Sequence, residues 1–303
     1  MKIVVTGSSG LVGELLSARL VDSGHGVLPI DLVGGHPQDF RQWAAGACRV
    51  PFDGVVHLAA ISRVAWGEAQ PDLCSSINVA GTQVLCDMLA THPAQPWLLF
   101  ASSREVYGDP VSPVVFENDP LLPVNHYGRS KLEGERLVQR FRADGGQAAI
   151  LRLSSVYGGR RDHPDRAIPA LVQRALSGEP LRLTGADHYF DFVHVAGVVD
   201  GIVRTIELLA AGERALPPVH LASGVATSLR QLAEEAVSAT GSASPIIETP
   251  ARSFDVAGFC GSPERAQRLL GWKATTSLAE GVRQVADNLR RAGPLTAVLM
   301  PLA

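Results

Sequence analysis

The sequence predicts an α/β protein built on a doubly wound, parallel β-sheet, with a smaller and discontinuous second domain. In the first half of the chain, short runs of apolar residues alternate with segments of helical periodicity. The apolar runs are continuous rather than alternating, which is typical of strands covered by helices on both faces. With 303 residues, the chain is also long enough for two fused units.

The first half gives the clearer succession of elements. The segment from residue 32 to 53 is ambiguous, although residues 40–43 fit a helical turn and residues 48–50 a short strand. In such a fold the crossovers are right-handed, and ligands bind at the carboxyl ends of the strands. We predict strands at 3–6, 27–30, 55–60, 97–102 and 148–154, and helices at 11–21, 71–89 and 125–142.

The second half is less regular. We place the domain boundary after residue 154, so that residues 1–154 form the first domain and residues 155–303 most of the second, with a return to the first from about 189 to 222. Helices are predicted at 166–176, 195–209, 229–239, 263–270 and 277–290, and short strands at 181–183, 192–194 and 219–221.

Composition excludes several classes of protein. Hydrophobic residues make up 46% and charged residues 19% of the chain, which suits a large core and not a disordered chain. The net charge of -3 and the lack of a basic stripe argue against binding to nucleic acid. No apolar run reaches the length of a membrane span and no signal peptide is recognisable, so we expect a cytoplasmic protein.

Cysteines and histidines give no sign of a metal or disulfide site. The four cysteines lie far apart, without a C-x-x-C motif, and we expect reduced thiols. The nine histidines are equally scattered, so we predict no metal site.

A glycine-rich loop links the first strand to the first helix. The segment from Thr6 to Gly13 has the spacing G-x-x-G-x-x-G. Gly7 allows a tight turn, Gly10 lets backbone N–H groups approach a pyrophosphate, and Gly13 allows close packing of helix on strand. Plain turn chemistry is the alternative. The position at the start of an α/β pattern favours a phosphate cradle.

An acidic residue closes the second predicted strand. Asp31 stands where a carboxylate accepts hydrogen bonds from the ribose hydroxyls of a dinucleotide. A 2′-phosphate would be repelled there by several kcal/mol (at about 5 Å and an effective dielectric constant near 20), so NAD is favoured over NADP. A helix cap or a solvated loop acid is the alternative.

A tyrosine and a lysine open the long helix predicted at 125–142. Tyr127 and Lys131 are four residues apart and therefore share one helix face. An ammonium group and a nicotinamide cation both favour the phenolate, which suits proton removal from a sugar or alcohol hydroxyl. Ser103, at the end of the strand 97–102, can hold the substrate oxygen. The alternatives are an exposed amphipathic tyrosine and plain strand-terminating serines.

Taken together, these motifs resemble those of the extended short-chain dehydrogenases/reductases, in the NAD-dependent epimerase/dehydratase branch that acts on nucleotide sugars. The resemblance spans nearly the whole chain. Its marks are the glycine loop, His57 to Ala60, Asn78 to Thr82, Ser102 to Gly108, Tyr127 to Lys131, Val156 to Gly158, Asp191 to Val195 and Leu270 to Trp272.

The resemblance implies roles for single residues. Tyr127 would be the catalytic base, Lys131 its partner and Ser103 the Ser/Thr of the site. A Rossmann domain would hold NAD, and the second domain the nucleotide-sugar substrate. The implied cofactor-binding residues are Gly7, Gly10, Leu11, Val12, Asp31, Leu58, Ala59, Ala60, Asn78, Tyr127 and Lys131.

Family members commonly form homodimers by packing two helices from each subunit. Here the helices 71–89 and 125–142 would make that contact. The apolar candidates for it could equally belong to the monomer core; they are Leu73, Val84, Met88, Leu137 and Phe141.

Some positions depart from the family pattern and give the candidate substrate contacts Arg104, Ser155 and Phe190. Dehydratases carry an Asp-Glu pair where this chain has Arg104-Glu105, which argues against 4,6-dehydration. Many members have Asn at 155 and Arg at 190, both contacting the diphosphate. The acid that contacts adenine has no clear match, and residues 48–50 stand in its place. Arg104 either faces a sugar carboxylate or pairs with Glu105.

We therefore predict an NAD-dependent nucleotide-sugar epimerase that acts at C4 through a transient 4-keto sugar, with Tyr127 as the base. The alternative is an NAD(P)-dependent nucleotide-sugar ketoreductase or a sugar dehydrogenase with an exchangeable cofactor. A catalytically silent NAD-binding protein is disfavoured because Ser103, Tyr127 and Lys131 are all present.

Overall fold

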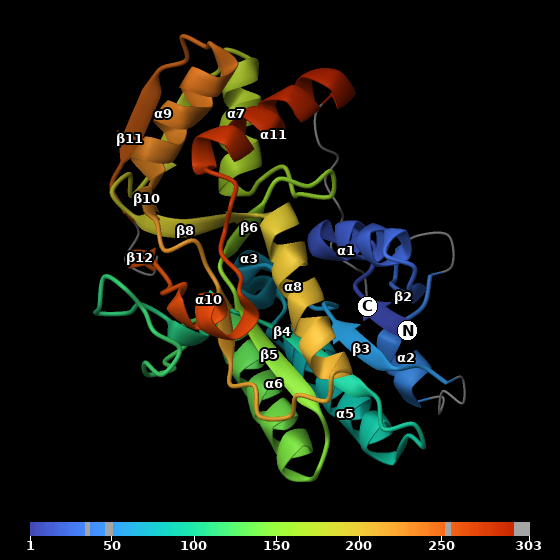
Figure 1. Cartoon of the computed structure of the whole chain (residues 1–303). Helices are drawn as coiled ribbons and strands as arrows, with labels where there is room; N and C mark the ends of the chain where they lie inside the picture. Colours follow the sequence, from blue (N-terminus) through green and yellow to red (C-terminus); the bar gives the residue numbers. More distant parts are fainter. Residues whose placement is uncertain (34–36, 46–50, 252–255, 294–303) are drawn as a thin grey trace.

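A doubly wound parallel sheet forms the centre of the first half, as predicted, and it has six strands, the last of which comes from the second half of the chain (Figure 1). The computed structural model describes residues 1–33, 37–45, 51–251 and 256–293. From β1 the chain adds β2 on one side, and it then adds β3 and the later strands on the other side. The carboxyl ends of β1 and β3 therefore flank the crevice where ligands bind in doubly wound folds. The strands in spatial order are β2 (Gly26–Ile30), β1 (Lys2–Thr6), β3 (Gly54–His57), β4 (Trp97–Ser103), β5 (Ala148–Leu153) and β9 (Val219–Leu221).

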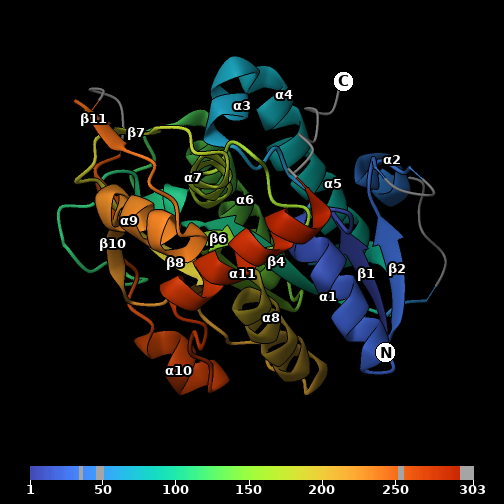
Figure 2. The same ribbon diagram turned by 90° about the horizontal axis from the view of Figure 1, so that it is seen from above.

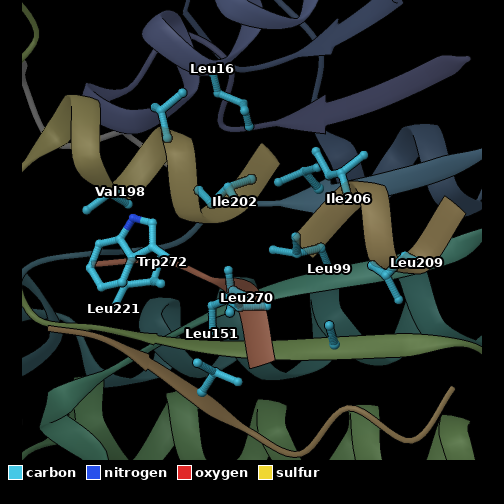
Figure 3. Packing of buried hydrophobic residues seen from close by; sticks show 14 of the residues in the cluster. Leu16, Leu99, Leu151, Val198, Ile202, Ile206, Leu209, Leu221, Leu270 and Trp272 are labelled. Atoms are coloured by element: carbon cyan, nitrogen blue, oxygen red, sulfur yellow. The ribbon is translucent and has the colours of Figure 1, made fainter. Parts of the chain in front are cut away.

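Helices cover both faces of this sheet, which explains the continuous apolar runs. Successive residues of β1 point to opposite faces: Ile3 and Val5 join one buried cluster, and Val4 joins the other. The first cluster lies under α1 (Leu11–Asp22) and α8 (Val195–Ala210) and includes Trp272, as Figure 3 shows. The second lies under α2 (Phe40–Ala45), α5 (Gly81–Thr91) and α6 (His126–Ala143).

The second half builds a separate apolar core beside the carboxyl ends of the sheet (Figures 1 and 2). The helices of this core are α7 (Ala167–Leu176), α9 (Leu229–Thr240) and α11 (Leu278–Ala292). Helix α10 (Glu264–Leu270) lies instead beside β9, at the edge of the first sheet. One small sheet contains β6 (Ser155–Tyr157), β8 (Tyr189–His194), β10 (Ala226–Ser228) and β12 (Gly258–Phe259), and a second pairs β7 (Leu181–Thr184) with β11 (Ile246–Thr249).

Two elements of the second half join the first sheet, α8 as a cover and β9 as an edge strand. Strand β8 pairs with β6, β10 and β12, while its Val193 packs into the core of the first half. The domain boundary after residue 154 and the return from about 189 to 222 stay predictions. The predicted strand at 48–50, the thiol of Cys48 and the apolar tail lie outside the described residues. Cys74, Cys86 and Cys260 are free.

The predicted helix 71–89 is a composite. It consists of α4 (Pro71–Ser75), a π-helical stretch (Ser76–Ala80) and α5, and a short helix that the sequence did not predict, α3 (Val64–Ala69), precedes it. Among the described residues, Pro71–Thr91 is long and apolar enough to cross a membrane by length and composition, so the prediction that no stretch meets this criterion was wrong. Half of the stretch is buried within the fold, as in the core helices of soluble proteins.

Candidate active site

A cavity of about 510 Å³ opens at the carboxyl ends of β1, β3 and β4, on the side that faces the second half of the chain. Of the predicted site residues, all but Asn78 and Phe190 are among the described residues that line it. These lining residues are Gly7, Gly10, Leu11, Val12, Asp31, Leu58, Ala59, Ala60, Ser103, Arg104, Tyr127, Lys131 and Ser155.

The glycine loop has the geometry that a dinucleotide cradle requires. Gly7 has a φ of 72°, and a Cβ there would lie 2.7 Å from the backbone nitrogen of Ala59. A Cβ on Gly13 would lie 2.0 Å from the carbonyl oxygen of Gly7, so α1 can begin this close to β1 only with glycine. The loop therefore presents bare backbone to the cavity at the start of a helix, which suits a pyrophosphate.

Asp31 lies beside this loop. Its Oδ2 accepts a hydrogen bond from the Ser9 backbone N–H at 2.8 Å, and its Oδ1 accepts one from Val33 at 3.1 Å. The carboxylate thus sits next to the glycine loop and lines the same cavity, a position that would suit the ribose of a dinucleotide whose pyrophosphate lay on the loop. Glycine loop, carboxylate and cavity together fit a dinucleotide.

Asn78 has a different position from the one that the resemblance implied. Its side chain is buried and accepts from the Ile61 backbone N–H at 2.8 Å, while its amide donates to the Ile61 carbonyl at 3.0 Å and to the Ser130 hydroxyl at 2.9 Å. Ile61 follows the cavity-lining segment Leu58 to Ala60 and itself lines the cavity. Asn78 therefore shapes the cavity wall from behind.

Helix α6 brings Tyr127 to the cavity because its first turn is fixed to the 3₁₀ turn Arg104–Tyr107 that follows β4. Asn125 caps the helix by accepting from the Gly128 N–H at 2.7 Å and donates to Oε2 of Glu105 at 2.7 Å. A Cβ on Gly128 would lie 2.4 Å from the Glu105 carbonyl oxygen, so glycine permits this close approach. Tyr127 is held beside Ser103, whose hydroxyl forms a hydrogen bond with the phenol.

The two titratable groups of the helix face have shifted pKa values. Burial raises the pKa of Tyr127 to about 12, opposed by the Ser103 hydrogen bond. Burial also lowers the pKa of Lys131 to about 8, opposed by the charges of Cys74 and Glu135. The Lys131 Nζ donates to the Ala101 carbonyl at 2.8 Å and lies 6.0 Å from the centroid of the Tyr127 ring. In the protein alone, burial therefore sets the pKa of Tyr127 above its ordinary value, and Lys131 is not among the described groups that act on it, contrary to the expectation from the sequence.

The three predicted substrate contacts are not equivalent. Ser155 lines the cavity. Arg104 also lines it, but its guanidinium pairs with Oε1 of Glu105 at 2.7 Å and lies 4.7 Å from the centroid of the Phe190 ring. The pairing with Glu105, one of the two sequence alternatives, is the arrangement observed. The ring of Phe190 packs against the Arg104 guanidinium. Phe190 is not among the described residues that line the cavity.

The mouth of the cavity carries residues that the sequence did not single out for the site. Arg63 pairs with Asp165, and His163 also contacts Asp165, so a loop after β3 meets a loop after β6. Trp66 packs edge-on against His163 with ring centroids 5.6 Å apart. Because these residues are about a hundred positions apart in sequence, no local pattern indicates their contact.

Comparison with known proteins agrees with this geometry. The model of the NAD dependent epimerase/dehydratase family matches residues 3–216. A UDP-glucose 4-epimerase of Corynebacterium glutamicum is 28% identical over 302 residues, covering 90% of each chain.

Solved structures are similar over the whole fold. MoeE5, in a complex with UDP-glucuronic acid and NAD, is 29% identical with a TM-score of 0.89, covering 96% of this chain and 100% of that one. The UDP-glucose 4-epimerase of Thermotoga maritima, with UDP-glucose, is 25% identical with a TM-score of 0.88, covering 96% and 99%. The family match and the dinucleotide cavity agree on NAD as the cofactor. The chain belongs to the NAD-dependent epimerase/dehydratase family of enzymes.

Proposed function

We propose that this chain is an NAD-dependent nucleotide-sugar 4-epimerase. The observation that carries the proposal is that Ser103, Tyr127 and Lys131 meet in one cavity with the glycine loop and Asp31. The similarity over nearly full length to proteins named UDP-glucose 4-epimerase supports it.

In the proposed reaction, Tyr127 removes the proton from the sugar hydroxyl while the Ser103 hydroxyl holds the same oxygen. NAD, when bound, supplies the acceptor for the hydride that leaves the carbon and later returns to it. Lys131, which is fixed to the Ala101 carbonyl, provides positive charge near the phenol. After the 4-keto sugar turns over, Tyr127 returns the proton to the oxygen, and the reaction has no net redox change.

The substrate we propose is a nucleoside-diphosphate sugar. Several cationic side chains line the cavity, which suits a diphosphate; they are Arg41, Arg63, Arg104, Lys131, Arg161 and Arg166. The Arg104 guanidinium is already paired with Glu105, so it supports a preference for an acidic sugar less than the sequence alone suggested. UDP-glucose and UDP-glucuronic acid, both bound by structural neighbours, are the substrates to compare.

The experiment that tests the function uses the purified protein without added cofactor. Each UDP-sugar is incubated in large excess, and the products are separated by anion-exchange chromatography. An epimerase with retained NAD converts many equivalents of substrate to the C4 epimer. Product formed only when NAD(P) or NAD(P)H is added in proportion would instead indicate the exchangeable-cofactor oxidoreductase.

We also propose that the protein is a cytoplasmic homodimer, with contacts from α4, α5 and α6. The predicted apolar contacts need revision, because Leu137 and Phe141 are buried in the monomer and Leu73, Val84 and Met88 pack against the same core. The outward faces are polar, with Asp72 and Asp87 on one helical stretch and Arg136 and Arg140 on the other. We expect a dimer in light scattering that weakens with salt; a monomer at micromolar concentration contradicts this proposal.

A further inference from the structure

We propose that Glu135 is a positioning residue for the reaction, which holds the end of β4 through Ser102 and maintains the positive charge of Lys131. This inference rests on the proposed function, since it assigns the action of Glu135 through Lys131 and Tyr127. It is carried by a regular set of contacts between α6 and the last residues of β4.

Three residues of α6, spaced four apart, contact three successive residues of β4. Tyr127 meets Ser103, and Lys131 donates to the Ala101 carbonyl at 2.8 Å. Glu135 accepts a hydrogen bond from the Ser102 hydroxyl at 2.5 Å. Because residues four apart stack on one helix face, this stripe fixes the strand end that carries Ser103.

Glu135 is fully buried, at 0% exposure, and its carboxylate is satisfied from two strands. Besides Ser102, it accepts from Arg152 of β5 at 2.9 Å on Oε1 and at 2.7 Å on Oε2. Ser102 and Arg152 are partners in the parallel register of β4 and β5. The carboxylate therefore ties the catalytic helix to both strands at one point directly below the cavity.

The groups coupled electrostatically to Lys131 lie on two helices and one strand. Cys74 of α4 and Glu135 of α6 act on the ammonium, and His57 of β3 is close enough to be affected by it. Behind Glu135 stand Arg152 and the phenol of Tyr107, which accepts from Arg152 at 2.6 Å. Glu135 is thus the carboxylate among the described groups that act on Lys131, and it favours the protonated amine.

If the Glu135–Arg152 ion pair only stabilised the fold, its removal would have a different effect on the titration of Lys131. A buried Arg–Glu pair can often be exchanged for apolar residues at little cost in stability, and such an exchange leaves the titration of a separate amine unaltered. If Glu135 acts on Lys131, removing its charge favours the neutral amine and moves the titration of Lys131 to lower pH. The ammonium is then lost at a lower pH than in the wild type.

The test compares Glu135→Gln with Glu179→Gln, which removes the same charge from the surface, where Glu179 pairs with Arg174. The first readout needs no substrate: the rate of acylation of Lys131 by acetic anhydride against pH, followed by peptide mass spectrometry. In the wild type and in Glu179→Gln, the midpoint should lie near pH 8. In Glu135→Gln we expect it lower by roughly 0.5 to 1 pH unit.

The second readout is the pH profile of kcat for epimerisation. In the proposed reaction Lys131 acts as the ammonium, so we expect activity to fall as pH rises through the pKa of Lys131, and this limb should move to lower pH in Glu135→Gln by the same amount. Ser102→Ala keeps all charges and removes one hydrogen bond to the strand end. We expect this variant to lower kcat severalfold without moving the pH at which kcat falls.

An acylation midpoint of Glu135→Gln equal to that of the wild type overturns the inference. If this variant does not fold because Arg152 is left unpaired, the double variant Glu135→Met with Arg152→Met replaces the pair, and a midpoint below that of the wild type is again expected, with a smaller shift because a more distant cation is removed as well. The proposed function fails separately: it is refuted if the wild type epimerises no nucleotide sugar, whatever the acylation midpoint is.

Discussion

Asp31 should decide between NAD and NADP, and its replacement by Asn isolates the charge. Asn keeps an oxygen that can accept from the Ser9 N–H, which Asp31 binds at 2.8 Å, so the loop should keep its shape. A 2′-phosphate about 5 Å from the carboxylate would be repelled by about 3 kcal/mol at an effective dielectric constant of 20. That energy corresponds to about a hundredfold difference between the dissociation constants of NADP and NAD. Screening by solvent and salt weakens the repulsion, and we expect a difference of at least tenfold to remain.

Arg41, which lines the same end of the cavity, offers little compensation. Its guanidinium donates to Asp39 at 2.6 Å and to the Ser76 hydroxyl at 3.2 Å. We therefore expect the wild type to bind NAD at least tenfold more tightly than NADP, and Asp31→Asn to remove most of this difference.

The assay is isothermal titration of both cofactors to protein stripped of any retained NAD. Asp22→Asn, an exposed residue at the end of α1, is the control for net charge and should leave the ratio unchanged. Equal dissociation constants in the wild type, or an unchanged ratio in Asp31→Asn, would refute the reasoning.

Three further predictions concern the base, the cradle and a buried histidine. Tyr127→Phe should lower kcat by about 10² or more with NAD binding nearly intact, because it removes the hydroxyl that moves the proton; activity within a few-fold of wild type would show that Tyr127 is not the base. Gly13→Ala should weaken NAD binding and cost about 1–3 kcal/mol of stability in denaturant titrations, because its Cβ would lie 2.0 Å from the Gly7 carbonyl oxygen; unchanged stability would contradict this. Burial, with the nearby Arg152, lowers the pKa of His220 to about 3. The unfolded chain therefore takes up a proton below pH 6.5 that the native state does not, and stability falls as pH falls through this window. His220→Gln should reduce that slope by about 1 kcal/mol per pH unit between pH 6 and 5 in urea titrations, and an equal slope would refute the shift.

The sequence predicted the parts of the fold that have a strong local pattern. The apolar runs of β1, β3, β4 and β5 and the long helix α6 were all predicted, because burial on two faces and a helical period both leave a local signature. Strands β10, β11 and β12, of two to four residues, were not predicted. Short strands with pairing partners distant in the chain give little local signal, and of these only the ones with an alternating apolar pattern, such as β7 and β9, were predicted.

For the site, a motif predicts which residue types come together but not how deeply they are buried. Motif spacing indicated Tyr127 and Lys131 correctly as neighbours on one helix face. Depth decides the pKa values, and here burial raises that of Tyr127 although a lysine stands nearby. Asn78 shows the same limit, since its position in the motif does not reveal that its amide is used by Ile61 and Ser130.

Glu105 links the departure at position 104 to the chemistry of the site. A dehydratase needs an acid next to the catalytic hydroxyl residue that can give up a proton to the leaving group. Here one carboxylate oxygen of Glu105 is paired with Arg104 at 2.7 Å, and the other accepts from Asn125 at 2.7 Å. The guanidinium cannot supply a proton near neutral pH. Asn125 also caps α6, so Glu105 helps to hold the start of the helix that carries Tyr127. Beside Glu105, in the described part of the cavity, lie a phenol, a hydroxyl and an ammonium, a set that we expect to move one proton on and off a sugar oxygen and not to expel a hydroxyl group.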